Sequence, residues 1–311
     1  MDIKMNVVKT YKQYALVGIF ALFIAFATLL IKLRLHDAHL FKNEGFTFVV
    51  NSSQSNNPKS AQAALSSLTA SPSVAPPLQA TSTPSPMPRL FPAQALNLTN
   101  WKLTLPIGSS EQPTEVLQPE LATYKINPWF VALANGVRFL APVNGVTTSG
   151  SNYPRSELRE MKNNGTQNAS WSSTTGTHTM FLDEAITAVP TTKKHVVVGQ
   201  IHDASDDIIV IRLEYPTLYI NVNGKNVYPL DTSYTLEKRF TIKFVVNGGQ
   251  TKVYYNRNFA PAFTLGKSYS GAYFKAGAYT QSNCSKEGSY SLCNDNNYGE
   301  VVIYQVTVTH Q

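Results

Sequence analysis

The sequence predicts an all-β domain over residues 96–311, an antiparallel two-sheet β-sandwich of the jelly-roll type. Short runs that alternate apolar and polar residues, or that are rich in β-branched residues, recur from Leu96 onward between clusters of turn residues. The same stretch contains no segment with the 3.6-residue period of an amphipathic helix. About ten strands in these residues suffice for one two-sheet domain.

The expected strands follow one another closely along the chain. They span residues 101–106, 136–143, 155–160, 195–202, 207–215, 217–224, 239–249, 251–256, 271–281 and 299–310. Asn223 and Asn247 each precede a glycine between two of these runs. Because Asn and Gly adopt positive φ at low cost, both Asn-Gly pairs predict tight hairpin turns.

Residues 1–95 are expected to lie outside this domain. Residues 14–31 form an uncharged apolar run that is long enough to cross a bilayer core, with more basic residues before it than after it. We interpret this run as a transmembrane signal-anchor helix with residues 1–13 in the cytoplasm; a long cleaved signal peptide, with residues 1–13 as its n-region, is the alternative. Residues 32–95 form a Ser/Thr/Pro-rich linker, expected to be a disordered stalk. Both interpretations predict an extracellular protein, either secreted or tethered as a type II single-pass membrane protein.

The net charge of +7 is unevenly distributed. Residues 1–95 hold eight Lys or Arg against three Asp or Glu, whereas residues 96–311 hold eighteen against sixteen. The folded domain is therefore nearly neutral and lacks the basic field of a nucleic-acid-binding protein. We expect no nucleic-acid partner.

No metal site is expected. Cys284 and Cys293 are better explained as a disulfide of an exported domain, because the segment lacks the further Cys or His ligands that zinc requires. Asp203, Asp206 and Asp207 follow a strand closely, and a Ca²⁺ site is one interpretation of them. A solvated acidic turn is the simpler one.

Three of the expected strands place unusual polar side chains on one face. Side chains alternate along a strand, so those flanking Leu158, Ile201 and Phe274 should point away from the core. The side chains expected on that face are Arg155, Glu157, Arg159, Gln200, His202, Tyr273, Lys275, Tyr279 and Gln281. If the strands are neighbours, the face is cationic and aromatic. An ordinary solvated face with cross-strand ion pairs is the alternative.

Such a face suits an anionic ligand such as a uronic-acid polymer. Positioned Arg and Gln donors would neutralise a carboxylate and stabilise the enolate formed when the neighbouring C5 proton is removed. A base and an acid would complete a β-elimination without an organic cofactor. A glycoside hydrolase needs two facing carboxylates, but Glu157 and Glu160 should point to opposite sides of their strand. A non-catalytic jelly-roll lectin that binds an anionic polysaccharide remains the alternative.

The motifs RSELRE at 155–160, QIH at 200–202 and YFKAGAYTQ at 273–281 resemble the signature strands of polysaccharide lyase family 7, the alginate lyases. Their order and the WKLTLP opening at 101–106 are also similar to that family, over about residues 96–311. The resemblance implies a concanavalin-like jelly roll whose concave sheet forms the substrate groove. Glu157, although inside the first motif, is expected to orient an arginine because a carboxylate would repel the substrate.

The resemblance also implies roles for individual residues. Arg155 and Gln200 would neutralise the uronate carboxylate, with His202 as general base and Tyr279 as general acid. The residues that would line the sugar subsites are Arg159, Lys275, Tyr273 and Gln281. Ile201, at the centre of QIH, favours guluronate-containing blocks of alginate. We expect a monomer that cleaves endolytically and needs no cofactor.

Overall fold

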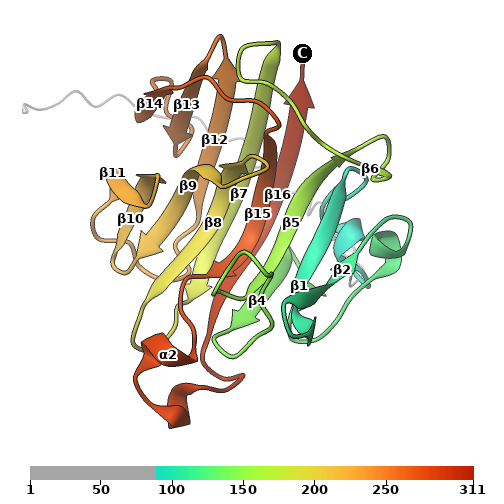
Figure 1. Cartoon of the computed structure of the whole chain (residues 1–311), viewed down its shortest axis with the longest axis vertical. Coiled ribbons are helices and arrows are strands. Elements are labelled where there is room, and N and C mark those ends of the chain that lie inside the picture. Colours follow the sequence, from blue (N-terminus) through green and yellow to red (C-terminus); the bar gives the residue numbers. More distant parts are fainter. Residues whose placement is uncertain (1–88) are drawn as a thin grey trace, which may run out of the picture. The chain divides into compact units, whose positions relative to one another are not determined.

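The computed structural model describes residues 89–311, which form two antiparallel sheets (Figure 1). The nine-stranded sheet has the order β11-β10-β9-β8-β15-β5-β1-β2, with β6 paired to β5. The seven-stranded sheet has the order β14-β13-β12-β7-β16-β4-β3. The predicted antiparallel two-sheet sandwich is confirmed. The expected membrane segment and most of the expected stalk lie outside the described residues.

The strands cover most of the described chain. Their bounds are β1 Trp101–Ser109, β2 Gln112–Val116, β3 Phe130–Ala132, β4 Val137–Pro142, β5 Arg155–Lys162, β6 Gln167–Asn168, β7 Thr177–Ala188, β8 His195–His202, β9 Asp207–Glu214, β10 Thr217–Val222, β11 Lys225–Asp231, β12 Phe240–Asn247, β13 Gln250–Tyr255, β14 Phe263–Gly266, β15 Tyr273–Thr280 and β16 Tyr298–His310. The short helices are η1 Pro92–Gln94, η2 Glu120–Thr123, α2 Cys284–Glu287 and η3 Tyr290–Leu292. Within residues 89–311, no helix is long and apolar enough to cross a membrane.

The core lies between the two sheets and consists of the inward side chains of alternating strands. In β15, Phe274, Ala276 and Ala278 are fully buried, and in β12 Ile242 and Phe244 are as well. Burial of these apolar surfaces is the main force that holds one sheet on the other. It also fixes strand register, because a shift by one residue would turn each apolar set outward.

Both predicted hairpin turns are present, but only the first is formed by its Asn-Gly pair. In the second, Asn247 ends β12 and pairs with Gln250, so that Gly248 and Gly249 make the turn. Asn223 and Gly224, between β10 and β11, have φ values of 51° and 74°. Gly248 and Gly249, between β12 and β13, have φ values of 56° and 73°. Two consecutive positive φ values match the right-handed twist of the flanking strands, which explains why these residues stand there.

The structure adds elements that the sequence pattern did not predict. The longest is β7, which lies between β12 and β16 in the seven-stranded sheet. The folded part also begins before residue 96, because Pro92 is buried and Ala93 packs against the core. The disulfide between Cys284 and Cys293 is confirmed, and it closes the segment that contains α2 and η3.

Candidate active site

The three motif strands are neighbours at the centre of the nine-stranded sheet, in the order β8-β15-β5. Lys275 on β15 is in register with Gln200 on β8 and with Arg159 on β5. Further along β15, Tyr273 is in register with His202, and Tyr279 with Arg155. Antiparallel pairing of these alternating strands therefore brings the predicted polar residues onto one outer face.

A groove of about 310 Å³ lies on this face. The predicted site residues that line it are Arg155, Arg159, Gln200, His202, Tyr273, Lys275 and Tyr279. Gln281 does not line the groove, because β15 ends at Thr280 and the Gln281 backbone N–H donates to the carbonyl of His195. Among the predicted substrate-binding residues, Gln281 is thus the one that the structure does not bring to the others.

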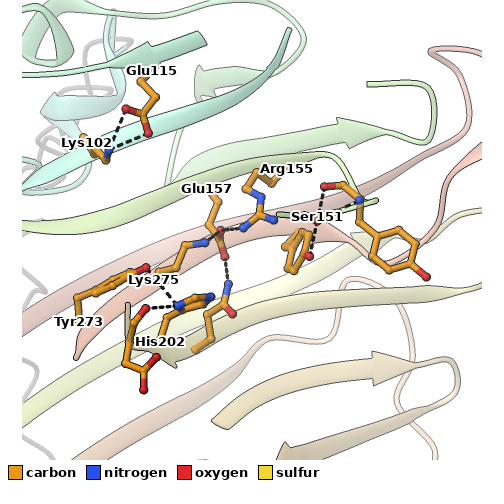
Figure 2. Close-up of polar contacts among 12 residues, drawn as sticks. Lys102, Glu115, Ser151, Arg155, Glu157, His202, Tyr273 and Lys275 are labelled. Atoms are coloured by element: carbon orange, nitrogen blue, oxygen red, sulfur yellow. Dashed lines mark hydrogen bonds and ion pairs between the residues drawn. The ribbon is translucent and has the colours of Figure 1, made fainter. Parts of the chain in front are cut away.

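Glu157 is the centre of a buried polar network beneath the groove (Figure 2). One carboxylate oxygen lies 2.5 Å from the Lys275 Nζ and 3.3 Å from an Arg155 Nη. The other accepts a hydrogen bond of 2.5 Å from the Gln200 amide. Burial alone would raise the pKa of Glu157, but the charges of Lys275 and Arg155 and these hydrogen bonds hold it below its usual value. Glu157 is therefore an ionised anchor for three donors. It bonds Arg155, one of the two arginines of its motif, whereas Arg159 donates to the carbonyls of Glu160 and Ala169.

His202 is held in one tautomer by its backbone neighbour. Its Nδ1 lies 2.6 Å from the carbonyl oxygen of Asp203, which can only accept a hydrogen bond. Nδ1 of the neutral ring therefore carries the proton, and Nε2 keeps a free lone pair. Burial lowers the pKa of His202 below its usual value, and the Lys275 charge acts in the same direction. The imidazole is consequently neutral at neutral pH and has a basic nitrogen.

Tyr279 is positioned by a loop residue and by a guanidinium. Its hydroxyl lies 2.8 Å from the Ser151 Oγ, and the Arg155 guanidinium lies 3.9 Å from the centroid of its ring. The Ser151 Oγ also accepts a hydrogen bond from the Tyr153 backbone N–H, which fixes the serine in the loop before β5. The phenol therefore keeps one orientation in the groove.

At the other end of the groove, a second arginine–tyrosine pair is fixed in the same way. The Arg159 guanidinium lies 3.9 Å from the centroid of the Tyr273 ring and donates to the carbonyls of Glu160 and Ala169. Tyr273 in turn places its hydroxyl 3.1 Å from the Nδ1 of His202. Arg159 thus contributes positive charge to the groove while its donors hold the loop after β5.

Gly277 permits the close approach of β15 and β5 at Glu157. Its φ is 145°, and a Cβ atom there would lie 2.5 Å from the Ser156 carbonyl oxygen and 2.8 Å from the Glu157 Cα. No other residue type fits these two constraints without moving a strand. A glycine at this position is therefore a packing requirement of the site.

Sequence reasoning missed several groove residues. Ser151 comes from a loop, where no periodicity marks it, and Lys102 and Glu115 form a 2.7 Å ion pair from β1 and β2 at the groove's edge. Of the acidic turn after β8, Asp206 and Asp207 line the groove. A functional residue in a loop can be identified from sequence only if it belongs to a known motif. Pairing of Lys102 with Glu115 follows from register, which sequence alone does not determine.

The arrangement combines an anion-binding cluster with a basic nitrogen and a phenol. Arg155 and Lys275 share one buried anion, Glu157, and Arg159 lies near them, so this cluster keeps a positive charge for a carboxylate. The carboxylates of Glu115, Asp206 and Asp207 also line the groove. The free Nε2 of His202 can accept a proton, and the Tyr279 hydroxyl can donate one. These are the groups that an elimination next to a carboxylate needs.

Comparisons with known proteins identify the fold and the family. The family model described as alginate lyase matches residues 96–310. An alginate lyase from Corynebacterium sp. is 51% identical, with 71% of this chain and 98% of that chain covered and a TM-score of 0.68. AlgAT5, an alginate lyase of polysaccharide lyase family 7, is also 51% identical, with 72% and 100% covered and a TM-score of 0.67.

A more distant family 7 alginate lyase, A1-II′, is 25% identical, with 72% of this chain and 98% of that chain covered and a TM-score of 0.55. With one histidine replaced by Asn and one tyrosine by Phe, it forms a complex with the substrate GGMG. A comparison with curated protein sequences found no match.

The family match spans the whole described sandwich and includes each strand that lines the groove. The chain therefore belongs to polysaccharide lyase family 7, the alginate lyases.

Proposed function

We propose that the groove cleaves the 4-O-glycosidic bond of alginate by β-elimination, with His202 as general base and Tyr279 as general acid. The observation that carries this proposal is the neutral His202 with a free Nε2, beside a cationic cluster that shares its groove with a positioned phenol. The same residue types, a histidine and a tyrosine, are the ones replaced in the substrate complex of A1-II′.

The reaction begins with binding of a uronate carboxylate by Arg155 and Gln200. Arg155 keeps further guanidinium N–H groups and Gln200 keeps the second N–H of its Nε2, while Glu157 accepts one hydrogen bond from each residue. Nε2 of His202 then removes the C5 proton, and the electron pair moves into an enediolate that the cationic cluster stabilises. The pair returns to form the C4–C5 double bond, the C4–O4 bond breaks, and Tyr279 protonates the departing O4.

The placement of base and acid supports a preference for guluronate-containing blocks. Tyr279 pairs with Val197, five residues before His202 on β8, so at ~3.3 Å per residue the backbones of His202 and Tyr279 lie about 16 Å apart. Their side chains thus reach the groove from opposite ends. In a guluronate ring with an axial 4-oxygen, the C5 hydrogen and that oxygen are trans, and their removal requires two groups on opposite sides. A syn elimination would instead use Tyr279 as both base and acid.

Ile201 is the residue whose type suggested this preference, and it is fully buried. It faces the core, so any effect on the substrate is indirect, through the placement of Gln200 and His202 on either side. Activity on separate poly-guluronate and poly-mannuronate measures the preference. A faster rate on poly-mannuronate would contradict it.

The position of the site in its sheet supports endolytic cleavage. β8, β15 and β5 are flanked by β9, β10 and β11 on one side and by β1 and β2 on the other. A polymer can therefore extend past the site in both directions instead of ending in a pocket. The expected products are mixed oligosaccharides early in the reaction; release of a single small product from the start would indicate an exolytic enzyme.

The remaining features of the proposal concern the whole protein. We keep the proposal of an active monomer, and light scattering of the purified protein tests it. The disulfide between Cys284 and Cys293 supports an extracellular site of action. We keep residues 14–31 as the proposed signal or anchor. The proposed linker begins at residue 32 and ends before Pro92, because Pro92 is buried in the folded domain. Mass measurement of the mature protein and its partition between membrane and medium test these points.

The experiment that tests this function follows near-UV absorbance during incubation with alginate. Elimination creates a conjugated unsaturated uronate that absorbs, whereas binding alone does not. We expect a steady rise with the parent protein and a loss of at least about 100-fold in His202→Ala and in Tyr279→Phe.

Arg155→Lys should also be severely impaired, because an ammonium cannot replace a bidentate guanidinium. Circular dichroism of each variant controls for folding, and a chelator should leave the parent rate unchanged. Tight binding of alginate without an absorbance rise would instead indicate a lectin. Complete loss with the chelator, restored by a divalent cation, would contradict a mechanism carried by side chains alone.

A further inference from the structure

The outer face of the seven-stranded sheet carries a row of aromatic and basic side chains. The groove lies on the other sheet. Lys243 on β12 is in register with Phe181 on β7 and with Tyr254 on β13. These three strands are adjacent in the sheet (Figure 1). Since Ile242 and Phe244 point into the core, the alternation of β12 turns Lys243 outward.

The turn after β13 adds a second cation and a third aromatic ring to this row. The Arg257 guanidinium lies 5.1 Å from the centroid of the Phe181 ring, and its side chain is 65% exposed. The Lys243 Nζ lies 4.3 Å from the centroid of the Tyr254 ring. Phe259, two residues further on, is fully exposed to solvent. A single exposed phenylalanine is common on proteins, but here it borders two cation–aromatic pairs.

These side chains enclose a hollow of about 400 Å³. Its lining consists of Phe181, Thr241, Lys243, Tyr254, Arg257, Asn258 and Phe259. No carboxylate is among them. The carboxylate of Asp183, which does not line the hollow, is buried and accepts from Arg239 at 2.5 Å and from Arg257 at 3.5 Å. The hollow is therefore cationic, aromatic and polar at once.

We propose that this hollow is a second, non-catalytic binding site for an alginate chain. Lys243 and Arg257 match the carboxylate carried by each uronate unit, and the rings of Tyr254 and Phe259 match the apolar faces of the sugars. Thr241 and Asn258 add hydrogen-bonding groups for hydroxyls. The choice of alginate as the ligand rests on the proposed function. Alginate, the proposed substrate of the groove, is an anionic polymer of sugar rings, and this surface offers cations and aromatic rings.

The two sites lie on the outer faces of different sheets. A chain held at the hollow therefore leaves the groove free, and it raises the local concentration of polymer around the groove. The effect should be limited to long substrates, because a short oligosaccharide cannot be held at the hollow and cleaved in the groove.

The test compares Lys243→Gln/Phe259→Ala with a matched control, Lys286→Gln/Tyr290→Ala. Lys286 and Tyr290 are exposed residues of α2 and η3, so the control also loses one positive charge and one exposed aromatic ring, away from both sites. We expect KM for polymeric alginate to rise about 3- to 10-fold in the first variant and not in the control. Turnover of an alginate tetrasaccharide should be equal in both. An unchanged KM for the polymer would overturn the proposal.

A binding measurement separates failure of this site from failure of the proposed function. In the Tyr279→Phe background, affinity electrophoresis in alginate-containing gels should show retardation that Lys243→Gln/Phe259→Ala reduces and the control pair does not. This readout does not depend on turnover, so it stands even if the parent protein proves inactive. A different outcome would show that a second copy of the chain covers this face. In that case both variants are retarded equally, and light scattering finds a dimeric parent protein but a monomeric Lys243→Gln/Phe259→Ala variant.

Discussion

At the scale of single residues, the carboxylate of Glu157 explains how two cations, Lys275 and Arg155, are held in fixed positions close together despite their repulsion. It accepts from Lys275, Arg155 and Gln200 within 3.3 Å and is almost completely buried. A carboxylate at the groove surface would repel the substrate, but beneath the surface it orients the donors that bind the substrate. The hydrogen bond from Gln200 to Glu157 also fixes the position of the Gln200 Nε2 beside the two cations.

The two titrating groups of the groove predict a bell-shaped pH profile. His202 must be neutral to accept a proton, and burial lowers its pKa below the usual value, so kcat/KM falls only when the pH drops below about 6.5. Burial, together with the charge of Arg155, lowers the pKa of Lys275 to about 8. The Lys275 charge is therefore present below that pH and lost as the pH rises through it.

Lys275→Arg tests this assignment, because a guanidinium stays charged throughout the accessible range. We expect the alkaline limb of kcat/KM to move upward in the variant while the acid limb stays in place. Initial rates of absorbance change from about pH 5 to pH 10 measure both limbs. An alkaline limb that stays at the same pH would show that Lys275 does not cause it.

The residues of the site differ in how far sequence could predict them. Arg155, Gln200 and Lys275 lie on regular strands, where alternation alone determines which side chains share a face. Gln281 was placed on that face by extending the alternation one residue beyond the end of β15. Ser151 was missed because its contact with Tyr279 joins residues 128 positions apart through a loop. Loop geometry depends on tertiary contacts that no local pattern encodes.

At the scale of elements, β7 is the longest strand that sequence reasoning missed, and one residue explains why. Glu184 occupies an inward position of β7, beside the fully buried Leu182 and Ile186. Both of its carboxylate oxygens are buried without a hydrogen-bond partner among the described residues. A charged residue type at a core position breaks the apolar alternation by which strands are recognised.

The burial of Glu184 predicts a pH-dependent stability. Burial raises the pKa of Glu184 well above its ordinary value of 4.5, and the charge of Asp183 acts in the same direction. The folded state then keeps a proton that the unfolded state releases, so this group lowers the free energy of unfolding as the pH rises above about 4.5. Glu184→Gln cannot ionise, so this decrease in the free energy of unfolding should be absent from the variant.

We expect Glu184→Gln to be more stable than the parent at pH 8 by about 1 kcal/mol or more, which is ~2–4 °C in Tm for a domain of this size. At pH 4 the two proteins should melt at nearly the same temperature. Glu237→Gln, which changes an exposed glutamate, controls for the change in net charge. Equal Tm differences at both pH values would show that Glu184 does not titrate abnormally.

At the scale of the whole molecule, the nearly neutral domain gathers cationic side chains at two places. Arg155, Arg159 and Lys275 lie in the groove, and Lys243 and Arg257 lie in the hollow on the opposite sheet. The fold class was predictable because strand alternation and Asn-Gly turns are local signals that agree along the chain. The strand order was not, since β15 lies between β8 and β5 although it follows them by more than seventy residues. Only the match of three motifs to one family indicated that these strands meet.

The central claim is that His202 and Tyr279 act as separate base and acid on one uronate ring. Deuterium exchange at C5 of a saturated alginate oligosaccharide in D₂O tests it most directly. In Tyr279→Phe the proton can leave and return but O4 cannot depart, so His202 should introduce deuterium at C5, detectable by mass spectrometry. His202→Ala/Tyr279→Phe should show only the uncatalysed rate. Equal exchange in the two variants, or none in Tyr279→Phe, would contradict the account.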